Sequence, residues 1–265
     1  MAEIVGAGFK RSLIIQARVV GALLMREILT RYGRHNIGFM WVFVEPMLFT
    51  LGVAGLWTLL KPGQGHHIDI VSFALTGYSS VLLWRNAVNR CNLAIAPNLS
   101  LMYHRNVRVI DIFAARLILE IAGATISLVV LSLFFIAIGW ISVPADVLTM
   151  VFGWLMLVWF AVGLGLVIGS ISERSEVVDR VWHTLTYLTF PLSGAVFMVD
   201  WLPRALQEIV LWIPMVHGVE MLRHGYYGEW VTTHYNLVYF ASINLVLMLI
   251  GLILVRQTQL RVEPE

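Results

Sequence analysis

The stretch from Leu24 to Leu60 constrains the fold of this chain more than any other. This stretch begins as a basic, amphipathic segment that ends with Arg31, Arg34 and His35. An apolar run over residues 37–60 follows. That run is long enough for a membrane-spanning α-helix, which needs about 20 residues. Cationic side chains beside a span prefer the cytoplasmic headgroups, so we expect this end of the first span to lie inside the cell.

The composition also indicates a membrane protein. Of the 265 residues, 59% are hydrophobic and 13% are charged, whereas soluble domains carry about 25% charged residues. A water-soluble fold of this size cannot bury so much apolar surface, which predicts an all-α, polytopic membrane protein. The net charge of +2 gives no reason to expect a nucleic-acid partner. A single cysteine, Cys91, excludes an internal disulfide and a thiolate metal cluster.

Six apolar stretches are long enough to serve as membrane spans. They lie at about 37–60, 68–89, 112–140, 147–170, 177–199 and 237–255. Arg116 and Glu120 are four residues apart in the third stretch and can pair along one helix face. Glycines in the fourth stretch predict close helix–helix approach. We expect residues 37–256 to form the transmembrane domain and residues 257–265 a cytoplasmic tail. Residues 1–36 show no cleavable signal peptide, so the first span is expected to direct insertion.

The distribution of lysine and arginine predicts the orientation of these spans. Six spans with both termini in the cytoplasm place most basic residues on the cytoplasmic side, as the positive-inside rule requires. The expected cytoplasmic segments hold Lys10, Arg11, Arg18, Arg26, Arg31, Arg34, Arg85, Arg90, Arg105, Arg108, Arg174, Arg180, Arg256 and Arg261. The expected outer segments hold only Lys61, Arg204 and Arg223.

Two other regions have the pattern of helices that do not cross the membrane. Residues 9–30 place apolar side chains on one helical face and arginines opposite, which fits a helix at the membrane surface or a helix packed on another domain. Segments 202–213 and 215–226 are each too short to span and are divided by Pro214. We expect them to form a re-entrant hairpin or a pair of helices at the outer surface.

Motifs for chemistry are missing from the sequence. There is no phosphate-binding GxxxxGK[ST], no HExxH and no convincing nucleophile triad, so we predict no catalytic residue, no metal site and no cofactor in this chain. A membrane-embedded enzyme of envelope synthesis and a non-transport scaffold remain as alternatives. Residues 90–111 form a cytoplasmic connection in which Asn98 or Ser100 can cap a short helix. That piece is either a solvated loop or a docking helix for a soluble partner.

Several aromatic residues lie within the expected spans. They either pack in the bundle or line a path along which sugar rings slide, because aromatic faces stack on the apolar faces of sugars. These residues are Phe39, Trp41, Phe43, Trp182, Tyr187 and Phe190. Glu45 lies in the first span, where a carboxyl group faces either protein or water, or else the cytoplasmic headgroups.

Three stretches resemble one family of transporters. MREILTRYGRHNIGFMWVFVEPMLFTLGV, PNLSLMYHRNVRVIDIFAARLILE and WIPMVHGVEMLRHGYYG are similar to the KpsM-like permease subunits of capsular-polysaccharide exporters, which belong to the ABC-2-type group. Essentially the whole chain takes part in the resemblance. A related permease for O-antigen, teichoic acid or a drug is the nearest alternative.

The resemblance implies partners and a substrate. The chain would form a homodimer and dock an ATP-binding, KpsT-like subunit that holds ATP and Mg. It would export a lipid-linked acidic polysaccharide across the inner membrane of a Gram-negative bacterium. A periplasmic adaptor and an outer-membrane export protein would work with it.

The resemblance also implies roles for particular segments. Residues 9–30 would be the interface helix, and residues 202–226 would close the pore on the outer side. The coupling helix would comprise Asn98, Ser100, Leu101, Met102, Tyr103, His104 and Arg105. Arg31, Arg34 and His35 would meet the anionic end of the substrate as it enters, or would only anchor the topology. The channel candidates would then be these three residues together with Phe39, Trp41, Phe43, Glu45, Trp182, Tyr187 and Phe190.

Overall fold

The computed structural model describes residues 2–32, 36–60, 69–102 and 107–262. Every regular element in these ranges is helical, which confirms the all-α prediction. The elements are α1 (Ala2–Tyr32), α2 (Asn36–Leu60), α3 (Ile70–Cys91), η1 (Ala96–Asn98), α4 (Leu99–Met102), α5 (Val109–Ala137), α6 (Val147–Ser172), α7 (Glu176–Leu192), η2 (Val199–Trp201), α8 (Arg204–Val210), α9 (Pro214–Tyr227), η3 (Gly228–Trp230) and α10 (Leu237–Val262).

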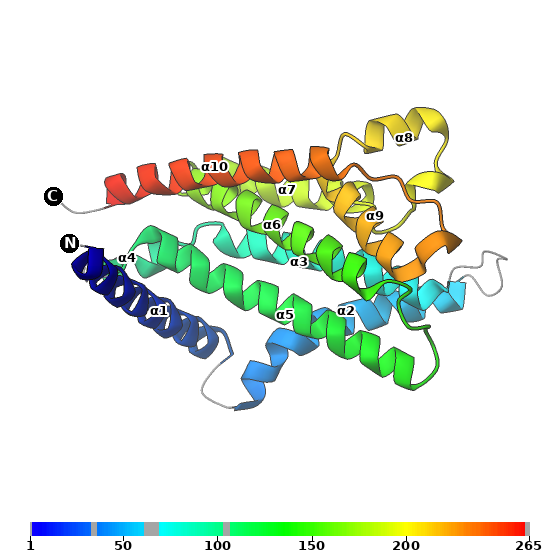
Figure 1. The fold of residues 1–265 in the computed structure, drawn as a ribbon, viewed down its shortest axis with the longest axis horizontal. Coiled ribbons are helices and arrows are strands. Elements are labelled where there is room, and N and C mark those ends of the chain that lie inside the picture. Colours follow the sequence, from blue (N-terminus) through cyan, green and yellow to red (C-terminus); the bar gives the residue numbers. More distant parts are fainter. Residues whose placement is uncertain (1, 33–35, 61–68, 103–106, 263–265) are drawn as a thin grey trace.

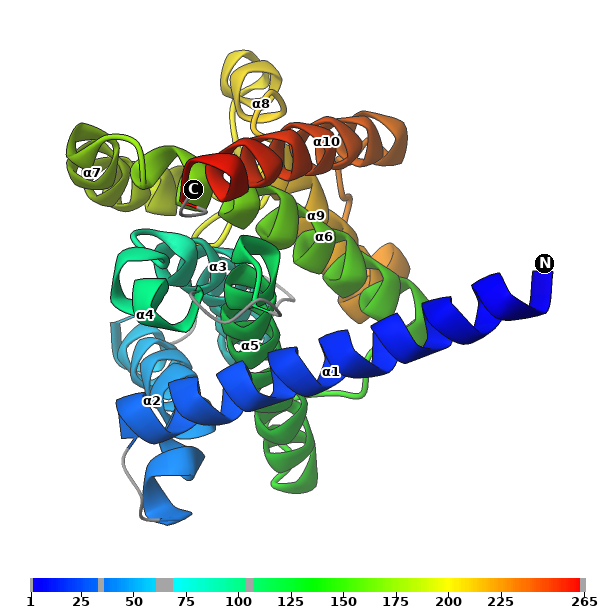
Figure 2. The same ribbon diagram turned by 90° about the vertical axis from the view of Figure 1, so that its left-hand side faces the viewer.

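The long helices run side by side along one axis (Figure 1). Both chain termini and α4 lie at one end of that axis, which we call the termini end; α8 lies at the opposite end, the far end. Helix α1 crosses the termini end of the bundle and reaches beyond it toward the N-terminus (Figure 2). Its C-terminal half packs inward through Leu23 and Ile28, whereas Leu13 and Ile14 in its N-terminal half are exposed.

Helix α3 lies at the centre of the bundle. Every residue from Val71 to Trp84 is buried, although the helix carries several serine and threonine side chains. Ser72, Thr76 and Ser80 are tolerated because their hydroxyl groups donate hydrogen bonds to backbone carbonyls three or four residues earlier. The interior is otherwise filled by large apolar side chains such as Trp84 and Phe113.

The glycines of α6 allow close packing, as the sequence predicts. A Cβ atom at Gly153 would lie 2.8 Å from the backbone nitrogen of Leu222 on α9. At Gly169 it would lie 2.7 Å from the carbonyl oxygen of Cys91 on α3. Neither position has room for a larger residue, so α6 approaches both neighbours at backbone distance.

Three of the expected spans satisfy length and hydropathy together within the described residues. They are α5, α6 and α10. Helices α2 and α3 coincide with two other expected spans, although α3 carries Arg85 and Arg90 in its C-terminal half. The count of six spans stays a prediction.

The fifth expected span ends earlier than its apolar run. Residues 177–199 were expected to be one span with kinks at Pro191 and Gly194. Helix α7 has 17 residues and stops at Leu192, between these two positions, so the expected end at Val199 is wrong. Gly194 follows with φ of 84°, a left-handed conformation that glycine adopts readily and that turns the chain away from the helix axis.

Helices α8 and α9 match the two short apolar segments. They are bent by 108° at the break before Pro214, the geometry of a broken span or a re-entrant loop. Pro214 stands at the first position of α9, where its missing N–H leaves no hydrogen bond unmade.

Candidate functional site

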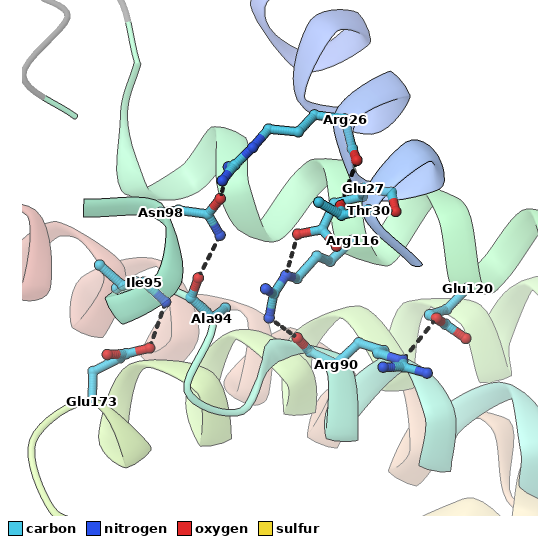
Figure 3. A network of polar contacts seen from close by, with 10 residues as sticks. All are labelled: Arg26, Glu27, Thr30, Arg90, Ala94, Ile95, Asn98, Arg116, Glu120 and Glu173. Carbon is cyan, nitrogen blue, oxygen red and sulfur yellow. Dashed lines mark hydrogen bonds and ion pairs between the residues drawn. The ribbon is translucent and has the colours of Figure 1, made fainter. Parts of the chain in front are cut away.

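A polar network at the termini end joins four parts of the chain that are distant in sequence (Figure 3). We call it the junction and define it by its side chains together with the backbone of residues 93–98. The side chains are Arg26, Glu27, Arg90, Asn98, Arg116, Glu120 and Glu173. The junction lies beside η1 and α4, where the coupling residues were predicted.

The backbone of the junction begins with a strained residue. Leu93 has φ of 46°, a left-handed conformation that costs a leucine about 1–2 kcal/mol. Its N–H donates to the Ser172 hydroxyl, 3.1 Å away at the end of α6. Two residues later, the N–H of Ile95 donates to Glu173 over 2.6 Å. The end of α6 therefore holds the chain in its path from α3 to η1.

Glu173 holds this turn from a partly buried position. Burial raises the pKa of its carboxyl group, and the backbone N–H groups of Ile95 and Ala96 act in the opposite direction. The carboxyl therefore receives hydrogen bonds from the segment it positions.

Asn98 connects this segment to α1. Its side chain is buried, donates from Nδ2 to the carbonyl of Ala94 over 2.8 Å, and accepts a hydrogen bond from Arg26. The sequence predicted Asn98 as a helix cap or as part of a coupling helix. The structure shows it as a bridge between α1 and the turn that precedes α4.

Arg116 provides the second connection to α1. Its Nε lies 2.8 Å from Glu27 Oε1, and its Nη1 donates to the carbonyl of Arg90 over 2.8 Å. Figure 3 shows Arg116 between these two partners. Arg90 in turn pairs with Glu120 at 3.2 Å. The sequence suggested an Arg116–Glu120 pair, whereas the structure gives each residue a partner on another helix.

The remaining coupling candidates differ in exposure. Ser100 is exposed, while Leu101 and Met102 are partly buried against the core. Tyr103, His104 and Arg105 lie outside the described residues. Within the described part of α4, Leu99 and Ser100 are therefore the residues exposed at the termini end.

The channel candidates on α2 and the preceding linker are only partly described. Trp41 and Glu45 on α2 are exposed. Arg31 lies in α1, and Phe39 and Phe43 lie in α2, but their side chains are outside the described part, as are Arg34 and His35 altogether.

The three channel candidates on α7 occupy different surroundings. Trp182 is buried and donates from Nε1 to Asn89 over 2.9 Å. Phe190 is half-buried, and its ring centroid lies 5.6 Å from that of Tyr78. Tyr187 is exposed, and the Arg85 guanidinium lies 5.1 Å from its ring centroid. These three rings do not form one cluster.

Sequence reasoning missed Glu27 and Glu173 as members of the junction. Glu173 directly follows the apolar helix α6, and this position is the available signal, because charges near a span seek partners. Glu27 lies in the amphipathic α1, where no such signal marks it. Their partners could not be identified, since Arg116 and Ile95 are distant in sequence.

The fold and the junction define a class: a helical, multi-pass membrane protein in which a polar network attaches α1 to a bundle of apolar helices. Residues 18–227 match the family model described as ABC-2 type transporter. The chain belongs to that family, so it is a transport protein and not an enzyme, as the sequence analysis expected.

Relatives align over nearly the whole chain. A capsule polysaccharide export inner-membrane protein, CtrC, from Neisseria meningitidis is 51% identical over 265 residues, which are 100% of both chains. A protein of the same description, BexB, from Haemophilus influenzae is 44% identical over 97% of both chains. The polysialic acid transport protein KpsM from Escherichia coli is 28% identical over 91% of this chain and 94% of its own. The resemblance to KpsM-like permeases is confirmed.

Proposed function

We propose that this chain is the transmembrane subunit of an exporter that moves lipid-linked capsular polysaccharide across the bacterial inner membrane, driven by ATP hydrolysis on a separate subunit. The observation that carries the proposal is the full-length similarity to proteins named for capsule polysaccharide export, at up to 52% identity.

The partner that hydrolyses ATP would be an ATP-binding, KpsT-like subunit, which would carry both ATP and Mg. It would dock at the termini end, on η1 and α4. The junction supports this site, because a force applied to residues 93–102 passes directly to α1 through Asn98 and to α6 through Glu173. Exposed Leu99 and Ser100 are the described residues of α4 available for contact.

Two copies of the chain would form the complete pore. Helix α1 would be the interface helix, and its exposed Leu13 and Ile14 suit contact with lipid or with another subunit. Helices α8 and α9 would close the pore on the outer side, with both termini in the cytoplasm. A periplasmic adaptor and an outer-membrane export protein would receive the polymer.

Substrate entry would involve the basic linker between α1 and α2. Arg31, Arg34 and His35 precede the first span and would attract the anionic lipid or linker end of the polymer. Reversing the charges of Arg31 and Arg34, while membrane insertion and export are measured separately, tests this role. Normal export at normal protein levels would refute it.

A deletion strain tests the proposed function. The chain should restore surface capsule in an encapsulated strain that lacks its own permease, and it should co-purify with a KpsT-like ATP-binding subunit. Capsule on the deletion strain without complementation, or purification of the chain always alone, would contradict the proposal.

A further inference from the structure

Helix α7 lies at the edge of the bundle (Figure 2). One of its sides is uncovered along its whole length, and five apolar residues on that side are 43–65% exposed. They are Val177, Val181, Leu185, Leu188 and Leu192. A helix covered on one side only can shift along its neighbours more easily than a fully buried one, so the contacts at its two ends decide what moves with it.

At the termini end, α7 is attached to the segment that forms the junction. Asp179 accepts a hydrogen bond from Asn92, the residue that immediately follows α3 and precedes the strained Leu93. One turn later, Trp182 donates to Asn89 over 2.9 Å. A displacement of residues 92–98 therefore acts directly on the first turns of α7.

At the far end, α7 is attached to α9 through Arg223. This arginine has no exposed surface. Its guanidinium donates to the carbonyls of Gly194 at 2.7 Å, Phe197 at 2.6 Å and Ala195 at 3.0 Å. These carbonyls follow the C-terminus of α7, where a cation is favoured by the helix dipole. The planar fork of an arginine can serve several acceptors at once, which a lysine cannot do.

The surroundings of Arg223 leave little freedom. Its guanidinium carbon lies 4.0 Å from the centre of the Phe73 ring on α3. A Cβ atom at Gly77, one turn along α3, would lie 2.8 Å from Arg223 Nη2 and 2.4 Å from the Ala195 carbonyl oxygen. Only a glycine fits there, so α3 lies directly against this attachment.

Glu220 on α9 extends the attachment to two further backbone segments. It is fully buried, and its carboxylate accepts from the N–H of Val199 at 3.3 Å and of His234 at 3.0 Å. It lies three residues before Arg223 on the same helix, so two opposite charges are buried together. Charges buried at this depth are costly unless they are fully bonded, and in membrane proteins they frequently mark function.

We propose that Arg223 is a positioning residue that joins the far end of α7 to the α8–α9 pair, so that α7 transmits movement of the junction to that pair. The inference rests on the proposed function. It assigns the link between ATP hydrolysis at one end of the bundle and opening at the other to a single peripheral helix with an attachment at each end.

The first test measures export and ATP hydrolysis separately for Arg223→Lys, which keeps the charge but loses the fork. Surface capsule, normalised to membrane protein level, should fall about tenfold while the ATPase activity of the purified complex stays within about twofold, as expected for loss of a typical coupling free energy. Arg204→Lys, at an exposed arginine on α8, is the matched control and should change neither quantity. If export and ATPase activity fall together, or if neither falls, the proposal is wrong.

The second test uses the other end of α7. Asp179→Ala removes the acceptor for Asn92, and His183→Ala is its control because it removes only the 3.3 Å contact between His183 and Asp179. Asp179→Ala should show the same separation of export from ATPase activity, and it carries the test alone if Arg223→Lys does not accumulate.

The double variant decides whether the two ends act through one helix. Distant independent sites have additive effects, so their losses of export would multiply. Transmission through α7 predicts that the double variant exports no less than the more impaired single variant. A multiplied loss would overturn the proposal, whereas failure of the unchanged chain to restore capsule would instead overturn the proposed function.

Discussion

Arg116 offers a quantitative test of how α1 is attached to the bundle. Its side chain is 15% exposed and that of Glu27 is 24% exposed, with 2.8 Å between Nε and Oε1. Because solvent still screens the pair, we expect it to contribute about 1 kcal/mol. The hydrogen bond from Arg116 to the Arg90 carbonyl adds about 1 kcal/mol. Arg116→Gln should therefore lower the free energy of unfolding by about 2 kcal/mol.

A double-mutant cycle separates the two contributions. Unfolding of the purified protein in mixed micelles is followed as the fraction of SDS rises, for Arg116→Gln, Glu27→Gln and the double variant. The coupling energy should be about 1 kcal/mol, and the same cycle between Glu27 and the exposed Arg256 should give about zero. A coupling below about 0.3 kcal/mol for Arg116 and Glu27 would refute the claim that this pair attaches α1.

Three further predictions concern packing, titration and topology. Gly169→Ala should destabilise the protein by about 1–3 kcal/mol, because its Cβ atom would lie 2.7 Å from the Cys91 carbonyl oxygen; Gly52→Ala, with nothing within 4 Å, should be neutral or slightly stabilising in the same SDS titration. Burial raises the pKa of the Glu173 carboxyl, so the folded state binds the carboxyl proton more tightly than the unfolded chain does. The free energy of unfolding should therefore decline as pH rises from about 4 through the raised pKa. Glu173→Gln should remove this pH dependence. The topology is tested in cells whose outer membrane is permeabilised while the inner membrane stays intact. A membrane-impermeant maleimide should label Trp230→Cys, at an exposed position, but should label Ser100→Cys only after the inner membrane is opened. The reverse pattern would exclude cytoplasmic termini.

The apolar runs predicted much of the fold because their length is a direct physical requirement of the bilayer. The run at 37–60 coincides with α2, and the run at 147–170 coincides with α6 to within two residues. The break at Pro214 between the two short segments was also predicted, and α8 and α9 are bent by 108° there. In each case the relevant information lies within one continuous stretch of residues.

The fifth span shows the limit of this reasoning. Residues 193–199 are as apolar as those before them, yet the helix ends at Leu192 because Gly194 turns the chain and Arg223 binds the carbonyls that follow. The turn depends on an arginine 29 residues away, which hydropathy cannot reveal.

The junction could be located from the sequence but not assembled. The sequence predicted that Asn98 and the residues after it form either a solvated loop or a docking helix, and the resemblance favoured the second. The partner of Asn98 is Arg26, 72 residues earlier, and that of Arg116 is Glu27, 89 residues earlier. Such pairs follow from tertiary packing, so spacing along the chain favoured the nearer Glu120 instead.

The central claim is that an ATP-hydrolysing subunit engages α4, and cysteine cross-linking tests it most directly. Cys91, the single native cysteine, is buried, so Ser100→Cys supplies an exposed thiol at this site. A thiol-to-amine cross-linker applied to membranes should join Ser100→Cys to the ATP-binding subunit, and should not join Trp230→Cys at the far end. An adduct from Trp230→Cys and none from Ser100→Cys, in cells with normal capsule, would contradict the account.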